Sequence, residues 1–155
     1  MNKIYTATVT ATGGRNGHVQ SPDKLVGFDF RFPKALGGAN DNYLNPELLF
    51  AAGYAACFDS ALNRIIKMEK VKTGTTTVTA HVSLGKMDES RFGLAVDLEI
   101  EIPGVDHTKA GELAQKAHAI CPYSNATRDN IEVNLIVKQT VTTNTNWLPF
   151  VQRIE

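Results

Sequence analysis

The sequence predicts an α+β domain whose elements follow the order βββ-α-ββ-α-β. Extended runs with apolar or β-branched residues at every second position occur near both ends of the chain, which is typical of half-buried strands. Between them lies a run in which nearly every residue is apolar or small, as in a helix buried on all sides. No repeat, linker or low-complexity segment divides the 155 residues, so we expect a single domain over 1–155.

The first three strands are predicted at residues 3–12, 18–23 and 25–32. The first run, KIYTATVTAT, ends at the glycine-rich turn GGRNG, which carries Arg15. In the third run the apolar side chains alternate with polar or small ones, at Val26, Phe28, Phe30 and Phe32. This period of two predicts one buried and one exposed face.

A long central helix is predicted over residues 46–70. Asn45 is a suitable N-cap, and Pro46 is favoured at the first helical position. Glu47 lies in the first turn, where a carboxylate stabilises the helix dipole. Because residues 48–58 are almost all apolar or small, we expect this part of the helix to be buried.

The C-terminal half is predicted to contain a second helix at 108–120 and strands at 75–87, 92–102 and 131–141. Cys121 follows the second helix and precedes Pro122, which pushes the backbone of Cys121 out of the helical region. The helix should therefore end at this thiol. We expect Cys121 to lie at an element end, partly mobile and able to move toward a partner.

The composition excludes several classes of function. Sixteen basic and sixteen acidic residues cancel without forming a charged block, so we expect no nucleic-acid and no membrane partner. The N-terminus has no apolar signal segment, and no stretch approaches 18 consecutive apolar residues, so we expect a cytoplasmic protein. In a reducing cytosol, cysteines act as metal ligands, catalytic groups, redox sensors or buried apolar residues rather than as permanent disulfides.

Each candidate functional residue could also have a purely structural role. Cys57 lies about eleven residues into the predicted helix, so the helix dipole cannot lower its pKa, and a reactive thiol there would need a side-chain cation. It could equally be a small buried apolar residue. Arg15 could be a solvated surface residue. His118 and Cys121 share a three-residue spacing, but no cluster completes a set of metal ligands, so we expect no metal and no other cofactor.

Three segments, TATGGR, NPELLFAAGYAACF and CPYSNATR, resemble the organic hydroperoxide resistance (Ohr) proteins of the Ohr/OsmC superfamily. The resemblance spans nearly the whole chain, with Leu48 where the family commonly has glutamine. It implies an OsmC-like fold, an intertwined homodimer and a thiol peroxidase. It further implies that Cys57 is the peroxidatic thiol, Cys121 the resolving thiol, Arg15 the activating cation and Glu47 the carboxylate that orients it. Dihydrolipoyl groups on lipoylated proteins would be the reductant.

The implied chemistry suits these residue types. An arginine beside a thiol favours the thiolate, and its planar group can bind a carboxylate while other N–H donors stay free. The helical stripe of Phe50, Tyr54 and Phe58 is predicted to face alkyl or fatty-acid hydroperoxides, although core packing explains at least two of the three equally well. The alternatives are a noncatalytic carrier of apolar ligands and a redox-sensing protein on the same fold.

The spacing of Glu47 and Cys57 raises a geometric question. Ten residues of straight helix rise roughly 15 Å, so the two side chains cannot share a site within one continuous helix. Either the helix breaks, for which Gly53 is the internal candidate, or Arg15 and Glu47 reach the cysteines of a second chain. We predict the second arrangement, with each site shared between two subunits.

Overall fold

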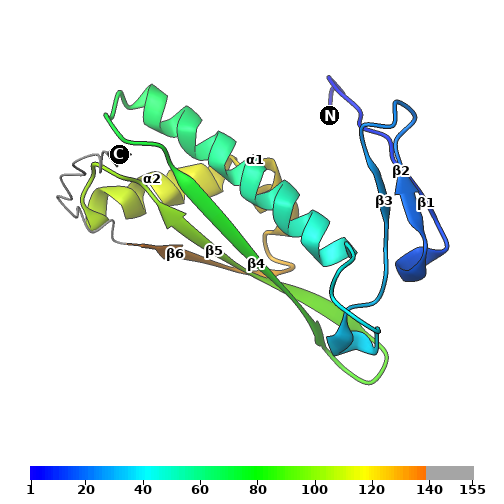
Figure 1. The fold of residues 1–155 in the computed structure, drawn as a ribbon. Helices are drawn as coiled ribbons and strands as arrows, with labels where there is room; N and C mark the ends of the chain where they lie inside the picture. Colours follow the sequence, from blue (N-terminus) through cyan, green and yellow to red (C-terminus); the bar gives the residue numbers. More distant parts are fainter. Residues whose placement is uncertain (139–155) are drawn as a thin grey trace, which may run out of the picture.

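The computed structural model describes residues 1–138 and has a mixed α+β fold (Figure 1). Its strands and helices follow in the order β1 (Thr10–Thr12), β2 (His18–Gln20), β3 (Gly27–Asp29), α1 (Pro46–Met68), β4 (Thr77–Lys86), β5 (Phe92–Glu101), α2 (His107–Ile120), α3 (Pro122–Thr127) and β6 (Glu132–Val137). The predicted order is confirmed, with the short helix α3 added before the last strand.

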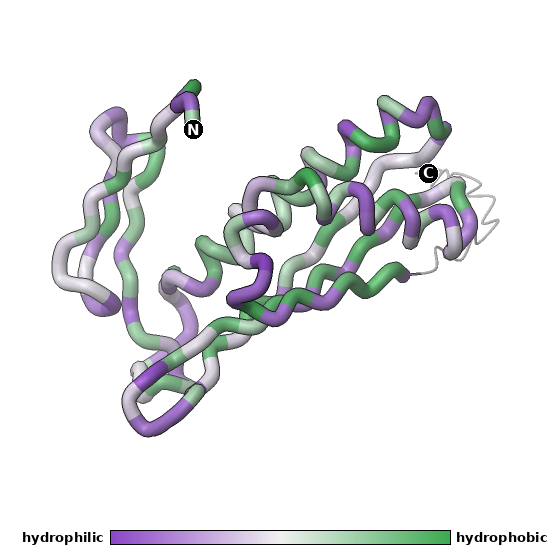
Figure 2. Tube along the Cα trace, turned by 180° about the vertical axis from the view of Figure 1, so that it is seen from behind, coloured by the Kyte–Doolittle hydropathy of each residue, from purple (hydrophilic) through white to green (hydrophobic). Residues whose placement is uncertain are grey.

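The first three strands form a small antiparallel sheet in the order β1-β2-β3. Figures 1 and 2 show this sheet standing apart from both α1 and the larger sheet, with the segment after β3 connecting the two parts. Apolar side chains on it remain in solvent, including Phe28, which is 39% exposed, whereas Phe30 is buried where its backbone bridges to Leu44. The predicted alternation therefore does not yield one uniformly buried face within this chain.

The helix α1 begins as the sequence predicts. The side chain of Asn45 accepts a hydrogen bond from the backbone N–H of Leu48 at 2.9 Å, and Pro46 occupies the first turn. The helix ends at Met68, two residues before the predicted end. It runs without interruption, so Gly53 does not break it, and that alternative is wrong.

The second sheet has the order β4-β5-β6, with β4 and β5 antiparallel and β5 and β6 parallel. The helices α1 and α2 pack against each other and cover one face of this sheet (Figure 1). Along β4, residues alternate between exposed and half-buried, because only one face of the sheet is covered. The fully buried core between the layers includes Tyr54, Phe58, Leu62, Val96, Leu98, Ile100, Leu113 and Cys121.

Further boundaries differ from the prediction, and β2 and β3 cover only three residues each of the runs predicted at 18–23 and 25–32. The strand predicted at 3–12 is reduced to β1, because residues 1–9 pair with no strand among residues 1–138 and lie exposed. The strand predicted at 131–141 is β6, and residues 139–141 lie outside the described part of the chain. Within residues 1–138, no helix has the length and apolarity that crossing a membrane requires.

Candidate active site

Arg15 lies in a tight turn that depends on glycine. Gly13 and Gly14 adopt left-handed backbone conformations with φ of 77° and 58°, which cost little only for glycine. A Cβ on Gly17 would lie 1.8 Å from the carbonyl oxygen of Thr12, so no larger residue fits there. The motif GGRNG therefore folds into a compact turn that projects one long cation.

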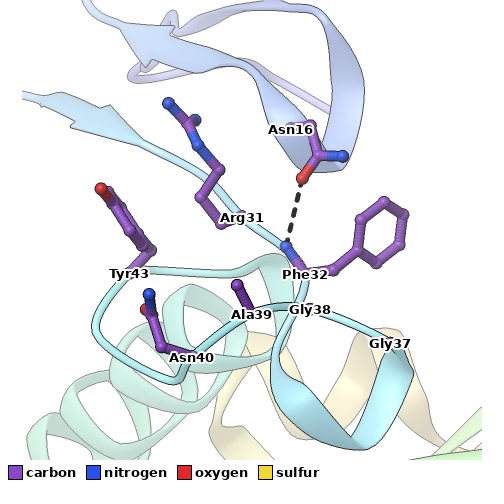
Figure 3. A pocket seen from close by; sticks show the side chains of 8 residues that line it. All are labelled: Asn16, Arg31, Phe32, Gly37, Gly38, Ala39, Asn40 and Tyr43. Carbon is purple, nitrogen blue, oxygen red and sulfur yellow. Dashed lines mark hydrogen bonds between the residues drawn. The ribbon is translucent and has the colours of Figure 1, made fainter.

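A loop packs against this turn and defines the path of the chain toward α1. The backbone N–H of Phe32 donates to Oδ1 of Asn16, the residue after Arg15, at 3.4 Å (Figure 3). An open pocket of about 400 Å³ lies here, and the guanidinium of Arg31 sits 5.1 Å from the ring centre of Tyr43 on its wall. The contacts fix the Arg15 turn relative to the loop that precedes Glu47.

Arg15 and Glu47 form a bidentate ion pair. Nη1 of Arg15 donates to Oε2 of Glu47 at 2.8 Å, and Nη2 donates to Oε1 at 2.6 Å. The hydrogen bonds from the guanidinium lower the pKa of the Glu47 carboxyl, while the bond to Glu47 raises the pKa of Arg15. Both groups are thus charged at neutral pH, and the carboxylate holds the guanidinium in one orientation.

The two cysteines meet in the interior, although 64 positions separate them in the sequence. The Sγ of Cys121 lies 3.8 Å from the Sγ of Cys57, and both thiols are free. Cys57 is half-buried on α1, and Cys121 is fully buried at the junction of α2 and α3. A disulfide has an S–S length of about 2.05 Å, so a modest approach of the two sulfurs would bring them to bonding distance once an oxidant takes up two electrons.

Burial is the largest influence on the Cys57 thiol and raises its pKa. A hydrogen bond from the backbone N–H of Tyr123 acts in the opposite direction, and the neighbouring thiol of Cys121 raises the pKa again. Within the described residues of one chain, no cation hydrogen-bonds or pairs with this sulfur. A single chain therefore leaves Cys57 mostly protonated at neutral pH.

The structure brings the predicted site residues together as two pairs. Arg15 contacts Glu47, and Cys57 contacts Cys121, but among residues 1–138 no hydrogen bond or ion pair links one pair to the other. The unbroken helix α1 separates Glu47 from Cys57 by roughly 15 Å along its axis.

The three predicted substrate-facing aromatic residues differ in burial. Tyr54 and Phe58 are fully buried in the core, and Phe50 is half-buried. The Phe50 and Tyr54 rings meet edge to face at 5.9 Å, and the Tyr123 ring lies 6.0 Å from Phe50. A substrate-facing role for the three stays a prediction, and the burial of Tyr54 and Phe58 agrees with the core-packing alternative.

The helix α3 and the polar network that it carries were not predicted from the sequence. We expected a mobile end after α2, but Cys121 is the N-cap residue of α3 and is fully buried. The hydroxyl of Tyr54 lies 3.0 Å from Oγ of Ser124 and 3.2 Å from Oγ1 of Thr127. The signal was Pro122, which ends one helix and is also favoured at the first position of the next.

No group of three or more histidine, cysteine or acidic residues within 1–138 is arranged to hold a metal ion. The reactive groups described above are thus the two thiols of Cys57 and Cys121 and the guanidinium of Arg15, which Glu47 orients. Such groups are suited to thiol-disulfide and peroxide chemistry.

The chain belongs to the OsmC-like protein family, whose model matches residues 38–136. It is 46% identical over 133 residues to the organic hydroperoxide resistance protein of Xanthomonas axonopodis pv. citri, covering 85% of this chain and 93% of that one. It is 47% identical over 139 residues to the organic hydroperoxide resistance protein OhrA of Bacillus subtilis, covering 88% of this chain and 97% of that protein. The resemblance seen in the sequence is thus confirmed.

Solved structures agree with this assignment. The organic hydroperoxide resistance protein of Elizabethkingia anophelis, crystallised with thiocyanate bound, superposes with a TM-score of 0.86 at 59% identity over 90% of this chain and 100% of that one. A related protein of Vibrio cholerae, with captopril bound in one of its active sites, gives a TM-score of 0.83 at 41% identity over 90% of this chain and 96% of that one. The OsmC-like fold is therefore established for this chain.

Proposed function

We propose that this protein is a cysteine-based peroxidase that reduces organic hydroperoxides to alcohols. The observation that carries the proposal is the 3.8 Å separation of the sulfurs of buried Cys121 and half-buried Cys57 at the edge of the core. Two free thiols at this distance can exchange between a reduced and a disulfide state without refolding. The names of the related proteins, organic hydroperoxide resistance proteins, support the same substrate class.

In the first step the Cys57 thiolate attacks the terminal oxygen of the hydroperoxide, which is the oxygen that carries the hydrogen. The O–O bond breaks, the alkoxide leaves and takes up a proton to become the alcohol, and Cys57 becomes a sulfenic acid. The step needs a thiolate and a donor for the leaving oxygen. An arginine can supply both effects, because its charge lowers the thiol pKa and its N–H groups bind the developing alkoxide.

In the second step the Cys121 thiol attacks the sulfur of the sulfenic acid. A disulfide forms between Cys57 and Cys121, and the hydroxyl leaves as water. A dithiol then reduces the disulfide by two exchanges and is itself oxidised to a cyclic disulfide. We propose a dihydrolipoyl group of a lipoylated protein as this dithiol. Its long aliphatic arm could reach through apolar surroundings to the disulfide, in which the Cys121 side chain is 0% exposed.

We further propose that the active form is an intertwined homodimer in which Arg15 and Glu47 of one subunit face Cys57 and Cys121 of the other. The raised pKa of Cys57 supports this arrangement, because the thiol needs a cation that its own chain holds elsewhere. Large apolar side chains left in solvent support it as well. They lie on the N-terminal segment, the small sheet and its β2–β3 loop, the start of α1 and the β4–β5 hairpin, and they include Ile4, Leu25, Phe28, Leu48, Met87 and Phe92.

The substrate is proposed to be an alkyl or fatty-acid hydroperoxide. Phe50, which is half-buried one helical turn from Tyr54, is the aromatic residue most able to meet an alkyl chain. An apolar surface favours such a substrate over strongly hydrated hydrogen peroxide. The cytoplasm, where lipoylated proteins and reducing thiols are available, is the proposed location.

Steady-state turnover with tert-butyl hydroperoxide tests the proposal, with dihydrolipoamide, thioredoxin and glutathione compared as reductants. We expect turnover with dihydrolipoamide and its loss in Cys57→Ser. A noncatalytic carrier would leave the hydroperoxide untouched under every condition. A redox sensor would form the disulfide once, without turnover.

A further inference from the structure

The segment from Cys121 to Thr127, which contains α3, contacts α1 at three places. The Tyr123 side chain lies over Gly53, where an added Cβ would come within 2.8 Å of the tyrosine hydroxyl. The hydroxyls of Ser124 and Thr127 reach the Tyr54 hydroxyl, and the Cys121 sulfur reaches that of Cys57. On α1 these contacts involve Gly53, Tyr54 and Cys57, and their partners lie at the N-cap and first turn of α3, so the start of α3 packs along this part of α1.

The polar contact in this line is buried and specific. The side chains of Tyr54, Ser124 and Thr127 all lie in the interior, where an unpaired hydroxyl is costly. Oγ1 of Thr127 donates to the carbonyl of Tyr123 at 3.0 Å, which leaves its oxygen free to accept from Tyr54. The Ser124 hydroxyl can then donate to the Tyr54 oxygen, so that every hydroxyl is satisfied.

The network and the thiols lie on the same faces of their helices. Tyr54 and Cys57 are three residues apart on α1, and Cys121 and Ser124 are three residues apart at the start of α3. Residues with this spacing are neighbours on a helix surface. Any movement of α3 away from Tyr54 would therefore carry the Cys121 sulfur away from Cys57.

We propose that the Tyr54–Ser124–Thr127 network is a positioning device that holds the Cys121 thiol within reach of Cys57. The inference rests on the proposed function only in that it requires the two thiols to form a disulfide. It assigns Tyr54 a role through its hydroxyl, which points to α3 and not to solvent. The network raises the effective concentration of one thiol at the other, as preorganised groups do.

The test measures the equilibrium between the dithiol and disulfide forms in buffers of reduced and oxidised dithiothreitol. In this exchange one disulfide is reduced while the other dithiol is oxidised, so the ratio reports the effective concentration of the protein thiols. We expect Tyr54→Phe to lower the protein disulfide's equilibrium constant about tenfold, which corresponds to about 1.4 kcal/mol and to the net worth of one or two hydrogen bonds. Tyr123→Phe is the matched control, because no hydrogen bond of its hydroxyl occurs within the described residues, and it should leave the constant unchanged.

The double variant Tyr54→Phe/Ser124→Ala controls for a general loss of stability. It also removes the Ser124 hydroxyl, which would otherwise be buried without its partner Tyr54. It should regain stability toward urea and keep the lowered equilibrium constant. An unchanged constant in both variants would overturn the positioning role, and an increased constant would show that the network holds the sulfurs apart. If the unaltered protein forms no disulfide, the proposed resolving role of Cys121 fails together with this inference. A normal disulfide that is insensitive to Tyr54 contradicts the inference alone.

Discussion

A shared active site between two chains predicts that two inactive variants restore each other. In Cys57→Ser the proposed peroxidatic thiol is missing, and in Arg15→Ala the proposed activating cation is missing. A heterodimer of the two has one site with an intact Cys57 from one chain and an intact Arg15 from the other, while its second site lacks both. Each heterodimer should therefore have about half the activity of the unaltered dimer, because a two-fold dimer contains two equivalent sites.

The expectation comes from the length of α1. Glu47 and Cys57 lie on one unbroken helix, roughly 15 Å apart along its axis, and Arg15 is held at Glu47 by bonds of 2.6 and 2.8 Å. The guanidinium cannot keep these bonds and contact the thiol of its own chain. If equal amounts of the variants reassort at random, about half the dimers are mixed, and total activity should reach about one quarter of that of the unaltered protein.

The assay is turnover of tert-butyl hydroperoxide with dihydrolipoamide after the two variants are unfolded and refolded together. A mixture of Cys57→Ser with Cys121→Ser is the control, because both thiols of a site come from one chain and no mixed dimer contains an intact pair. The control should show no recovery. If mass spectrometry proves heterodimers of the first mixture and activity is still absent, the shared site is refuted.

Further expectations concern single residues. Cys121→Ser should permit one turnover and leave Cys57 as a sulfenic acid that dimedone labels, so equal loss of the first turnover in both cysteine variants would contradict the assigned roles. Arg15→Ala should raise the pKa of Cys57 by about one unit or more, measured as the pH dependence of alkylation by iodoacetamide, and an unchanged curve would exclude Arg15 as the activating cation. The lowered pKa of Glu47 means that its pairing with Arg15 stabilises the fold above the pKa of the unfolded carboxyl, about 4.3, and that this stability is lost as the pH falls through the lower folded value. The difference in melting temperature between Arg15→Ala and the unaltered protein should therefore narrow in acid, and a constant difference would argue against the ion pair. Leu62→Ala removes a fully buried side chain and should destabilise the fold by about 2–5 kcal/mol in urea unfolding, whereas a change below 1 kcal/mol would place Leu62 outside the core.

Local sequence patterns determined most of the secondary structure. The start of α1 is encoded by Asn45 and Pro46, because capping needs only neighbouring residues. The paired strands β4 and β5 follow from alternation at period two, which the chain keeps over ten residues in each. The resemblance of the cysteine segments to a known family supplied the fold and the candidate residues.

The tertiary structure decided what local patterns cannot encode. The strand predicted at 3–12 shrank to Thr10–Thr12, because a strand exists only where a partner takes up its hydrogen bonds. Cys121 became a buried helix cap rather than a mobile end, because the hydroxyls of Ser124 and Thr127 find Tyr54 some 70 positions away. Likewise, the resemblance already implied that Arg15 pairs with Glu47 and Cys57 with Cys121, but only the tertiary structure set the distances at which each pair meets. Side chains that are distant in sequence meet where helices and turns bring them, and that placement depends on the whole fold.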